Sequence, residues 1–172
     1  SPFIDGDTKI QVSNVTSRPY IDLTRHTIKQ FNGTIKGTET EFIIPGNQKL
    51  KAASISLEGD WSNVSFHLVG AALKGEVSVS GLNMNSTQGD KIILDVLEDF
   101  GAKVELKSKD TITILSAFKK PFQVDLTDSP DLFPILSVLA CGAEGASSLI
   151  GIQRLTNKES NRNIDKNTSR NT

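Results

Sequence analysis

The chain has 172 residues, 37% of them hydrophobic and 23% charged, which is typical of a globular protein with a buried core. Its 19 basic and 20 acidic side chains nearly balance, so the composition argues against nucleic-acid binding, and no apolar run is long enough to span a membrane. The single cysteine, Cys141, excludes an internal disulfide, and two distant histidines, His26 and His67, provide no metal-ligand cluster.

The beginning of the chain shows no sign of targeting. Residues 1–6 do not resemble a signal peptide, and the sequence does not begin with methionine. We therefore expect a cytoplasmic location and a piece of a longer chain.

The first fifty residues predict a strand, a helix and a second strand. The strands are expected over residues 8–12 and 41–45. Between them, Ser17 is a candidate N-cap, Pro19 lies near the first helical position, and Asn32-Gly33 ends the helix. One face of this helix carries Tyr20, Leu23, Thr24, Thr27, Ile28 and Phe31.

The middle of the chain predicts two further helices and three strands. Asp60 caps a helix over residues 61–74, and a strand over 76–81 follows it with Val77 and Val79 on one face. Residues 86–90 open the next helix, which ends at Gly101 and is followed by a hairpin over 104–106 and 111–115. The buried stripe of this helix is expected to contain Ile92, Ile93, Val96, Leu97 and Phe100.

A fourth helix is predicted to begin at Asp128-Ser129-Pro130, with a strand over 148–152 after it. This helix is apolar on almost every side, so we expect it to be the most buried of the four. Its apolar residues are Leu132, Phe133, Ile135, Leu136, Val138, Leu139 and Cys141.

An internal repeat of about seventy residues is visible in the pattern of helices, strands and glycines. Gly75 and Gly81 flank one predicted strand, and Gly145 and Gly151 flank another 70 residues later. Such a unit is too long for a solenoid repeat. The sequence therefore predicts an α/β (α+β) protein that uses one small module two or three times, with the last copy incomplete.

Four polar clusters fall where a strand leads into a helix, at residues 17–20, 58–62, 128–131 and 158–162. Backbone N–H groups and the helix dipole attract anions at such positions. Each cluster also has a purely structural interpretation, as helix caps for the first three and as a solvated charge run for the last. From the residues alone, we expect an α/β protein that binds an anionic substrate.

The order of the polar motifs resembles that of the EPSP synthase (3-phosphoshikimate 1-carboxyvinyltransferase) family, and is most similar to bacterial members. The motifs are Ser-Arg-Pro-Tyr-Ile-Asp-Leu-Thr at 17–24, Glu-Gly-Asp-Trp-Ser at 58–62, Gln-Gly-Asp at 88–90, Ser-Pro-Asp at 129–131 and Lys-Glu-Ser-Asn-Arg at 158–162. The related UDP-N-acetylglucosamine enolpyruvyl transferases share the fold and are an alternative assignment, although their usual pattern lacks the Ser-Arg-Pro-Tyr segment.

The resemblance implies the inside-out α/β barrel of the enolpyruvyl transferases, in which each of two domains contains three βαβαββ units. Residues 1–57 would then end the shikimate-phosphate (N-terminal) domain and residues 58–162 would form part of the second domain. Residues 163–172 would be a polar tail, which we expect to be disordered. Because motifs from both ends of the family are missing, the chain would be an incomplete portion of the enzyme.

The resemblance also implies a reaction, in which the 5-hydroxyl of shikimate 3-phosphate adds to phosphoenolpyruvate and phosphate leaves from a tetrahedral ketal. Both substrates are polyanions, so the site needs cations and aimed N–H donors more than covalent chemistry. The family implies no metal or organic cofactor, and no nucleic-acid or membrane partner. We expect the complete protein to be a monomer in aromatic amino acid (chorismate) biosynthesis.

Site residues follow from the family's motifs, position by position. Ser17 and Tyr20 match residues whose hydroxyls contact shikimate 3-phosphate, and the nearby Arg18 could add charge. Asp131 matches the catalytic aspartate at the 5-hydroxyl and at shikimate 3-phosphate. It falls in the first turn of a predicted helix, where the dipole favours its anion.

The last motif supplies three further expected roles. Lys158 matches a lysine that relays a proton and contacts shikimate 3-phosphate, and Glu159 matches a glutamate near the enol methylene. Arg162 matches an arginine that holds phosphoenolpyruvate through a bidentate fork.

The sequence departs from the family around this last motif. Asn161 stands where aspartate is common, and Thr156 stands where arginine is common, with Arg154 as a neighbouring substitute. Residues 163–172 show no helical stripe where the family continues into a helix.

Three functions are compatible with these patterns. The first is an incomplete carboxyvinyltransferase that is inactive alone, which alone accounts for the missing motifs, the partial repeat and the polar tail together. The second is a non-catalytic module that binds phosphate or a phosphosugar. The third is a catalytically complete short enzyme.

Overall fold

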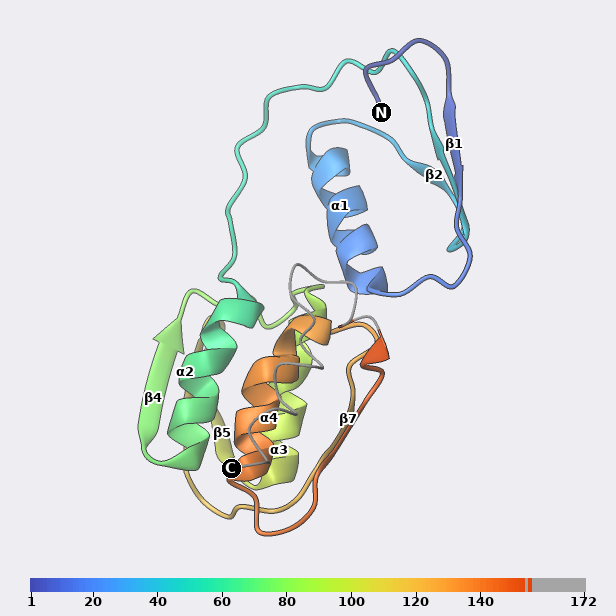
Figure 1. Ribbon diagram of the computed structural model, residues 1–172. Coiled ribbons are helices and arrows are strands. Elements are labelled where there is room, and N and C mark those ends of the chain that lie inside the picture. Colours follow the sequence, from blue (N-terminus) through green and yellow to red (C-terminus); the bar gives the residue numbers. More distant parts are fainter. Residues whose placement is uncertain (154, 156–172) are drawn as a thin grey trace. The chain divides into compact units, whose positions relative to one another are not determined.

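The computed structural model describes residues 1–153 and 155 of the chain (Figure 1). Its contacts divide the chain into two compact units. The first contains residues 1–58 with 86–89, and the second contains residues 59–85 with 90 and the residues that follow. No helix within the described residues is long and apolar enough to cross a membrane.

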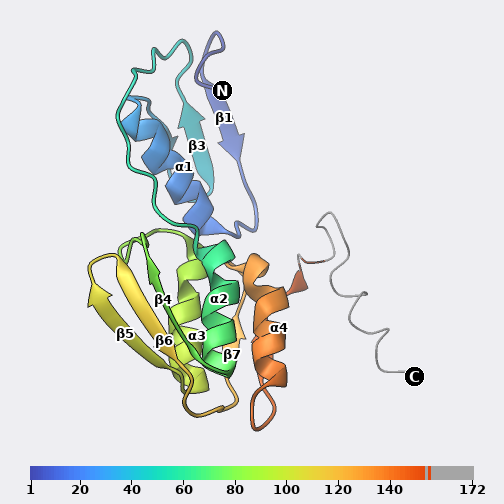
Figure 2. The same ribbon diagram turned by 90° about the vertical axis from the view of Figure 1, so that its left-hand side faces the viewer.

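The first unit is a three-stranded antiparallel sheet with one helix beside it (Figure 2). The sheet order is β1-β3-β2. The elements are β1 (Thr8–Gln11), α1 (Arg18–Gln30), β2 (Lys36–Gly37) and β3 (Glu41–Ile44). No residue of α1 is fully buried, whereas Phe42 in the central strand β3 is buried.

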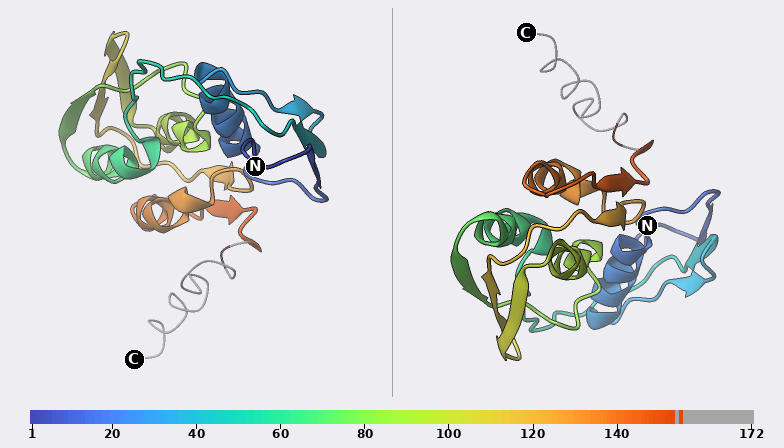
Figure 3. Two further views of the ribbon diagram at one scale, coloured as in Figure 1. Left: turned by 90° about the horizontal axis from the view of Figure 1, so that it is seen from above. Right: turned by 90° about the horizontal axis from the view of Figure 1, so that it is seen from below.

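Within its described residues, the second unit contains three helices side by side with one antiparallel and one parallel sheet (Figures 1 and 3). Strands β4, β6 and β5 are antiparallel in that order, and β7 pairs with β8 in parallel. The first elements are α2 (Trp61–Leu73), β4 (Glu76–Ser80), the 3₁₀ turn η1 (Gly89–Ile92), α3 (Ile93–Phe100), β5 (Lys103–Ser108) and β6 (Thr111–Leu115). The last are β7 (Gln123–Asp125), the 3₁₀ turn η2 (Pro130–Leu132), α4 (Phe133–Cys141) and β8 (Ser148–Ile150).

The predicted repeat is confirmed by the topology. A strand, a helix and two strands give the order β1-β3-β2 in the first unit and β4-β6-β5 in the second. The glycines around the equivalent strands β4 and β8 also share their backbone conformation. Gly75 and Gly145 have φ of 135° and 150°, and Gly81 and Gly151 have φ of 86° and 74°. These left-handed values favour glycine, which explains why glycine recurs there.

The expectation that the fourth helix is the most buried is wrong. Val138 is 52% exposed and Cys141 is also exposed, although Ile135, Leu136 and Leu139 are buried. The helix α2 packs against several elements, namely α3, α4, β4 and β6. Among the described elements, α4 packs mainly against α2, so its other face is left uncovered.

The structure also differs from the predicted elements in smaller details. The third and fourth helices each begin with a 3₁₀ turn, η1 and η2. Strands β2 and β7 were not predicted, because two or three residues are too few to show an alternating pattern. The predicted hairpin is confirmed as β5 and β6.

Candidate functional site

The start of α1 carries the first group of predicted site residues. Ser17 occupies the N-cap position and Pro19 the first turn, as predicted, and the backbone N–H of Tyr20 donates to the carbonyl of Ser17 at 3.1 Å. Ser17 and Tyr20 are both half-buried and belong to the same turn. Neither residue is therefore fully buried.

Ser17 does not cap α1 with its side chain, so that part of the prediction is wrong. Its backbone is left-handed, with φ of 53° and ψ of 39°, whereas a capping residue has extended backbone. With this backbone, the side chain makes no capping hydrogen bond to the first turn. Non-glycine residues with such values are uncommon and cost energy.

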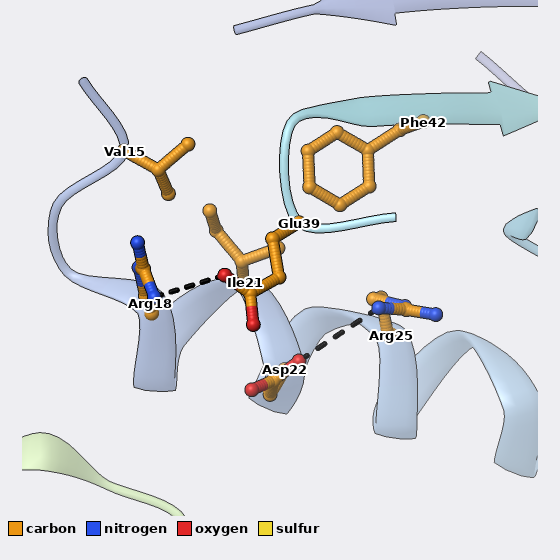
Figure 4. Close-up of a pocket in the computed structure, with 7 residues that line it drawn as sticks. All are labelled: Val15, Arg18, Ile21, Asp22, Arg25, Glu39 and Phe42. Atoms are coloured by element: carbon orange, nitrogen blue, oxygen red, sulfur yellow. Dashed lines mark ion pairs between the residues drawn. The ribbon is translucent and has the colours of Figure 1, made fainter. Parts of the chain in front are cut away.

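A small pocket lies beside α1 in the first unit, and Figure 4 shows its lining. Arg18 forms an ion pair with Glu39 at 2.9 Å, and Asp22 lies 3.9 Å from Arg25. The remaining lining is apolar, and neither Ser17 nor Tyr20 belongs to it. The lining residues are Val15, Arg18, Ile21, Asp22, Arg25, Glu39 and Phe42. Two cations and two carboxylates cancel in charge, so this pocket lacks the positive character that a polyanionic substrate requires.

The start of α2 is fixed by a side-chain cap, as predicted. The carboxylate of Asp60 accepts hydrogen bonds from the backbone N–H groups of Ser62 at 2.9 Å and Asn63 at 3.3 Å. The amide of Asn63 also donates to it at 2.6 Å. Asp60 is exposed, so it caps the helix from the surface of the unit.

Asp131 lies in the first turn of η2, directly after the buried Pro130, and η2 runs into α4. Its placement at a helix start in the second unit is as predicted, and its side chain is half-buried. The turn η2 packs against α2. Asp131 therefore lies on a turn that is packed against α2.

The segment that leads from β7 to η2 contains an Asp-Thr turn. The side chain of Asp125 accepts hydrogen bonds from the hydroxyl of Thr127 at 2.6 Å and from its backbone N–H at 2.9 Å. These two donors lower the pKa of Asp125, because they stabilise its charged form. This turn lies between β7 and η2 in the chain.

The remaining predicted site residues, Lys158, Glu159 and Arg162, lie outside the described residues, as do Arg154 and residues 163–172. No group of three or more His, Cys, Asp or Glu side chains within the described residues could hold a metal ion.

Asp90 and Glu58 were not among the predicted site residues, although both belong to the motifs that carry the family resemblance. Asp90 is fully buried and accepts a hydrogen bond from the hydroxyl of Ser62. Glu58 accepts hydrogen bonds from Ser86 and Gln88. Glu58 and Ser62 are four residues apart in one motif, and Ser86 and Asp90 are four residues apart in the other. This equal spacing of a carboxylate and a hydroxyl is the signal that could have found them.

Comparisons with known proteins agree with one family. The family model described as EPSP synthase (3-phosphoshikimate 1-carboxyvinyltransferase) matches residues 1–166. The 3-phosphoshikimate 1-carboxyvinyltransferases of Methanocorpusculum labreanum and Clostridium acetobutylicum are each 37% identical over 163 residues. These matches cover 94% of this chain but 38% and 37% of the two relatives. The chain therefore spans well under half the length of these relatives.

Solved structures show the same fold. An EPSP synthase from Acinetobacter baumannii has a TM-score of 0.68 at 24% identity, covering 91% of this chain and 37% of the other. The enolpyruvyl transferase NikO from Streptomyces tendae has a TM-score of 0.64 at 17% identity, covering 84% of this chain and 35% of the other. The predicted α/β class with incomplete enolpyruvyl transferase units is thereby confirmed.

Proposed function

The chain belongs to the EPSP synthase family, and we propose that it is part of an enzyme that makes 5-enolpyruvylshikimate 3-phosphate. The enzyme transfers the carboxyvinyl group of phosphoenolpyruvate to the 5-hydroxyl of shikimate 3-phosphate and releases phosphate. The observation that carries this proposal is the match over residues 1–166, in which the polar motifs keep their order along the chain.

In this proposal, the first turn of α1 contributes to the shikimate 3-phosphate site. The hydroxyls of Ser17 and Tyr20 lie in one turn, so they can bind the same ligand. The side chain of Ser17 does not cap α1, which is compatible with this role. The ion pair of Arg18 with Glu39 makes Arg18 the weaker candidate of this motif.

Asp131 is the proposed catalytic residue at the 5-hydroxyl. At the start of η2, its carboxylate is suited to orient the hydroxyl or accept its proton, since helix starts favour the anion. Lys158 would relay a proton and contact shikimate 3-phosphate, Glu159 would act near the enol methylene, and Arg162 would hold phosphoenolpyruvate. These roles require no metal or organic cofactor.

We also propose that residues 1–57 end the N-terminal domain and residues 58–162 form part of the second domain. The contacts of the structure, which separate residues 1–58 and 86–89 from the rest, support a division near this point. The partners are the two small-molecule substrates, with a monomer as the complete protein.

The isolated chain is expected not to turn over. Transition-state stabilisation here depends on cations that converge on two phosphates and a carboxylate, and each well-placed donor is worth about 10²–10³ in rate. The family supplies several of these groups from segments that this chain lacks, so turnover should fall below detection.

Two assays test the proposal. In a phosphate-release assay with both substrates, the chain should release no detectable phosphate. The Asp131→Ala variant should give the same result. Phosphate release that depends on both substrates and on Asp131 would instead establish a complete short enzyme. Titration calorimetry should detect shikimate 3-phosphate binding, whereas binding of inorganic phosphate with equal affinity would favour a non-catalytic phosphate-binding module.

A further inference from the structure

We propose that three residues at the carboxyl ends of β7 and β8 position the turn that carries Asp131. These residues are Asp125, Thr127 and Gly151, here called the strand-end cluster, and all of them belong to the second unit. They act through the backbone rather than on a substrate, so they are positioning residues. The proposal rests on the proposed function only for the role of Asp131, because the cluster itself consists of contacts within one unit.

The start of η2 needs such contacts because it has no side-chain cap. The helix α2, the equivalent element of the preceding repeat, is fixed at its start by the carboxylate of Asp60, which accepts hydrogen bonds from two backbone N–H groups. Ser129 occupies the N-cap position of η2, but its side chain makes no capping hydrogen bond. The position of η2 therefore depends on contacts made elsewhere in the segment that leads to it.

The first part of the strand-end cluster is the Asp-Thr turn directly after β7. The carboxylate of Asp125 accepts hydrogen bonds from the hydroxyl of Thr127 at 2.6 Å and from its N–H at 2.9 Å. Between these residues, the N–H of Leu126 donates to the carbonyl of Ile150, the last residue of β8, at 2.9 Å. Leu126 is also fully buried. The turn is therefore attached to both strands of the parallel sheet.

Gly151, the residue after β8, packs directly against this turn. A Cβ at Gly151 would lie 2.6 Å from both the nitrogen and Oγ1 of Thr127, and closer still to Oδ1 of Asp125. Glycine is therefore required for this close approach as well as for the φ of 74°. Gly81, the equivalent glycine after β4, has a φ of 86°, but a Cβ there meets nothing within 4 Å. Of these two glycines, only Gly151 has a turn packed against it.

Backbone hydrogen bonds connect the strand-end cluster to Asp131. The N–H of Ser129 donates to the carbonyl of Leu126 at 3.1 Å, and the N–H of Leu132 donates to the carbonyl of Ser129 at 3.2 Å. The neighbours of Asp131, Pro130 and Leu132, are both buried, whereas Asp131 itself is half-buried. The backbone on both sides of Asp131 is thus held relative to Leu126, so a displaced Asp-Thr turn should displace Asp131 as well.

Amide hydrogen exchange in the 172-residue chain tests the strand-end cluster. The N–H groups of Ser129 and Leu132 report opening of the segment around η2, because both make backbone hydrogen bonds there. The N–H of Ala102, which donates to the carbonyl of Leu97 at 2.9 Å at the end of α3, reports general destabilisation of the second unit. The measured quantity is exchange at the first two groups relative to exchange at Ala102.

Gly151→Ala is the first variant, because its Cβ displaces the Asp-Thr turn. It should raise relative exchange at Ser129 and Leu132 by about tenfold or more, as expected when hydrogen bonds to a carboxylate are broken. Gly81→Ala is the matched control, since it introduces the same side chain at a similar φ but in open space. Relative exchange should stay unchanged in Gly81→Ala.

Asp125→Ala removes the acceptor of the turn without adding an atom, so it gives the same test should Gly151→Ala fail to fold. It should also raise relative exchange at Ser129 and Leu132. Asp125→Asn keeps an acceptor oxygen and should restore most of the protection. Unchanged exchange at Ser129 and Leu132 in Asp125→Ala would overturn the strand-end cluster, whatever Gly151→Ala does.

A double-mutant cycle on shikimate 3-phosphate affinity tests the positioning role. If the strand-end cluster acts through Asp131, Asp125→Ala should weaken binding at least about twofold, and should have no effect in the Asp131→Ala background. No loss, or an equal loss in both backgrounds, would overturn the positioning role. Absence of binding by the unaltered chain would instead contradict the proposed function, and hydrogen exchange would then still decide whether the cluster holds the turn.

Discussion

The helices α2 and α4 are equivalent elements of the internal repeat, yet the structure holds them in different ways. The helix α2 begins at a side-chain cap, Asp60, and packs against helices and strands around it. The helix α4 begins through the 3₁₀ turn η2 without a side-chain cap and leaves Val138 exposed. The more hydrophobic sequence belongs to α4, so burial here is decided by which elements are available to pack against a helix.

The largest expected effect lies inside α4 itself, between a buried and an exposed position. Leu136 is fully buried, so Leu136→Ala should lower the free energy of unfolding by about 2–5 kcal/mol. Val138 is half-exposed on the same helix, so Val138→Ala should change it by less than about 0.5 kcal/mol. Urea unfolding of both variants measures the contrast. Equal losses would mean that Val138 is covered in solution.

A smaller effect is expected where the chain enters α2. Gly59→Ala places a Cβ 2.9 Å from the carbonyl oxygen of Gly81, and backbone atoms cannot yield as a flexible side chain does. Overpacking of this kind costs about 1–3 kcal/mol. Gly70→Ala is the matched control, because a Cβ at Gly70 meets nothing within 4 Å, and alanine favours the helix. A stabilised Gly59→Ala variant would show that the two backbones are not in close contact.

The cap of α2 is expected to contribute less again. Asp60→Ala removes the acceptor for the N–H groups of Ser62 and Asn63, which should cost about 0.5–2 kcal/mol. Asp60→Asn keeps an acceptor oxygen and should recover most of the loss. Thermal unfolding of the two variants compares them. If both lose the same amount, the charge of Asp60 matters and the cap geometry does not.

The smallest effect concerns the entry to η2 and depends on pH. The Thr127 hydroxyl and N–H lower the pKa of Asp125 below its usual value of 3.8, so the stabilisation is present above that pH. It is lost as the pH falls through the lowered pKa and the carboxyl protonates. Thr127→Val removes the hydroxyl donor, so its stability deficit at neutral pH should shrink below pH 3.8. A deficit independent of pH would assign the effect to packing.

The sequence allowed much of the fold to be predicted because the signals were local. Capping at Asp60, the glycine at 101 after α3 and the hairpin of β5 and β6 all depend on neighbouring residues. The exposure of Val138 could not be predicted, because it depends on the elements that surround α4. The parallel pairing of β7 with β8 was missed for the same reason, since it joins short segments far apart in the chain.

For the candidate site, too, local features could be predicted and features that depend on distant segments could not. Motif order indicated Ser17, Tyr20 and Asp131, and their places at helix starts followed from local patterns. The left-handed backbone of Ser17 and the burial of Asp90 could not be predicted, because a serine or aspartate before a helix ordinarily indicates an exposed cap. A residue at a helix start can thus serve the fold or the ligand, and only its surroundings decide which.

The most direct test of the proposed enzyme is an amide NMR titration of the 172-residue chain with shikimate 3-phosphate, using shikimate without phosphate as the control. We expect saturable shifts at residues 17–20 in the first turn of α1, weaker shifts with shikimate, and weaker binding in the Tyr20→Phe variant. Shifts that are absent from residues 17–20, or that are the same with and without the phosphate, would contradict it.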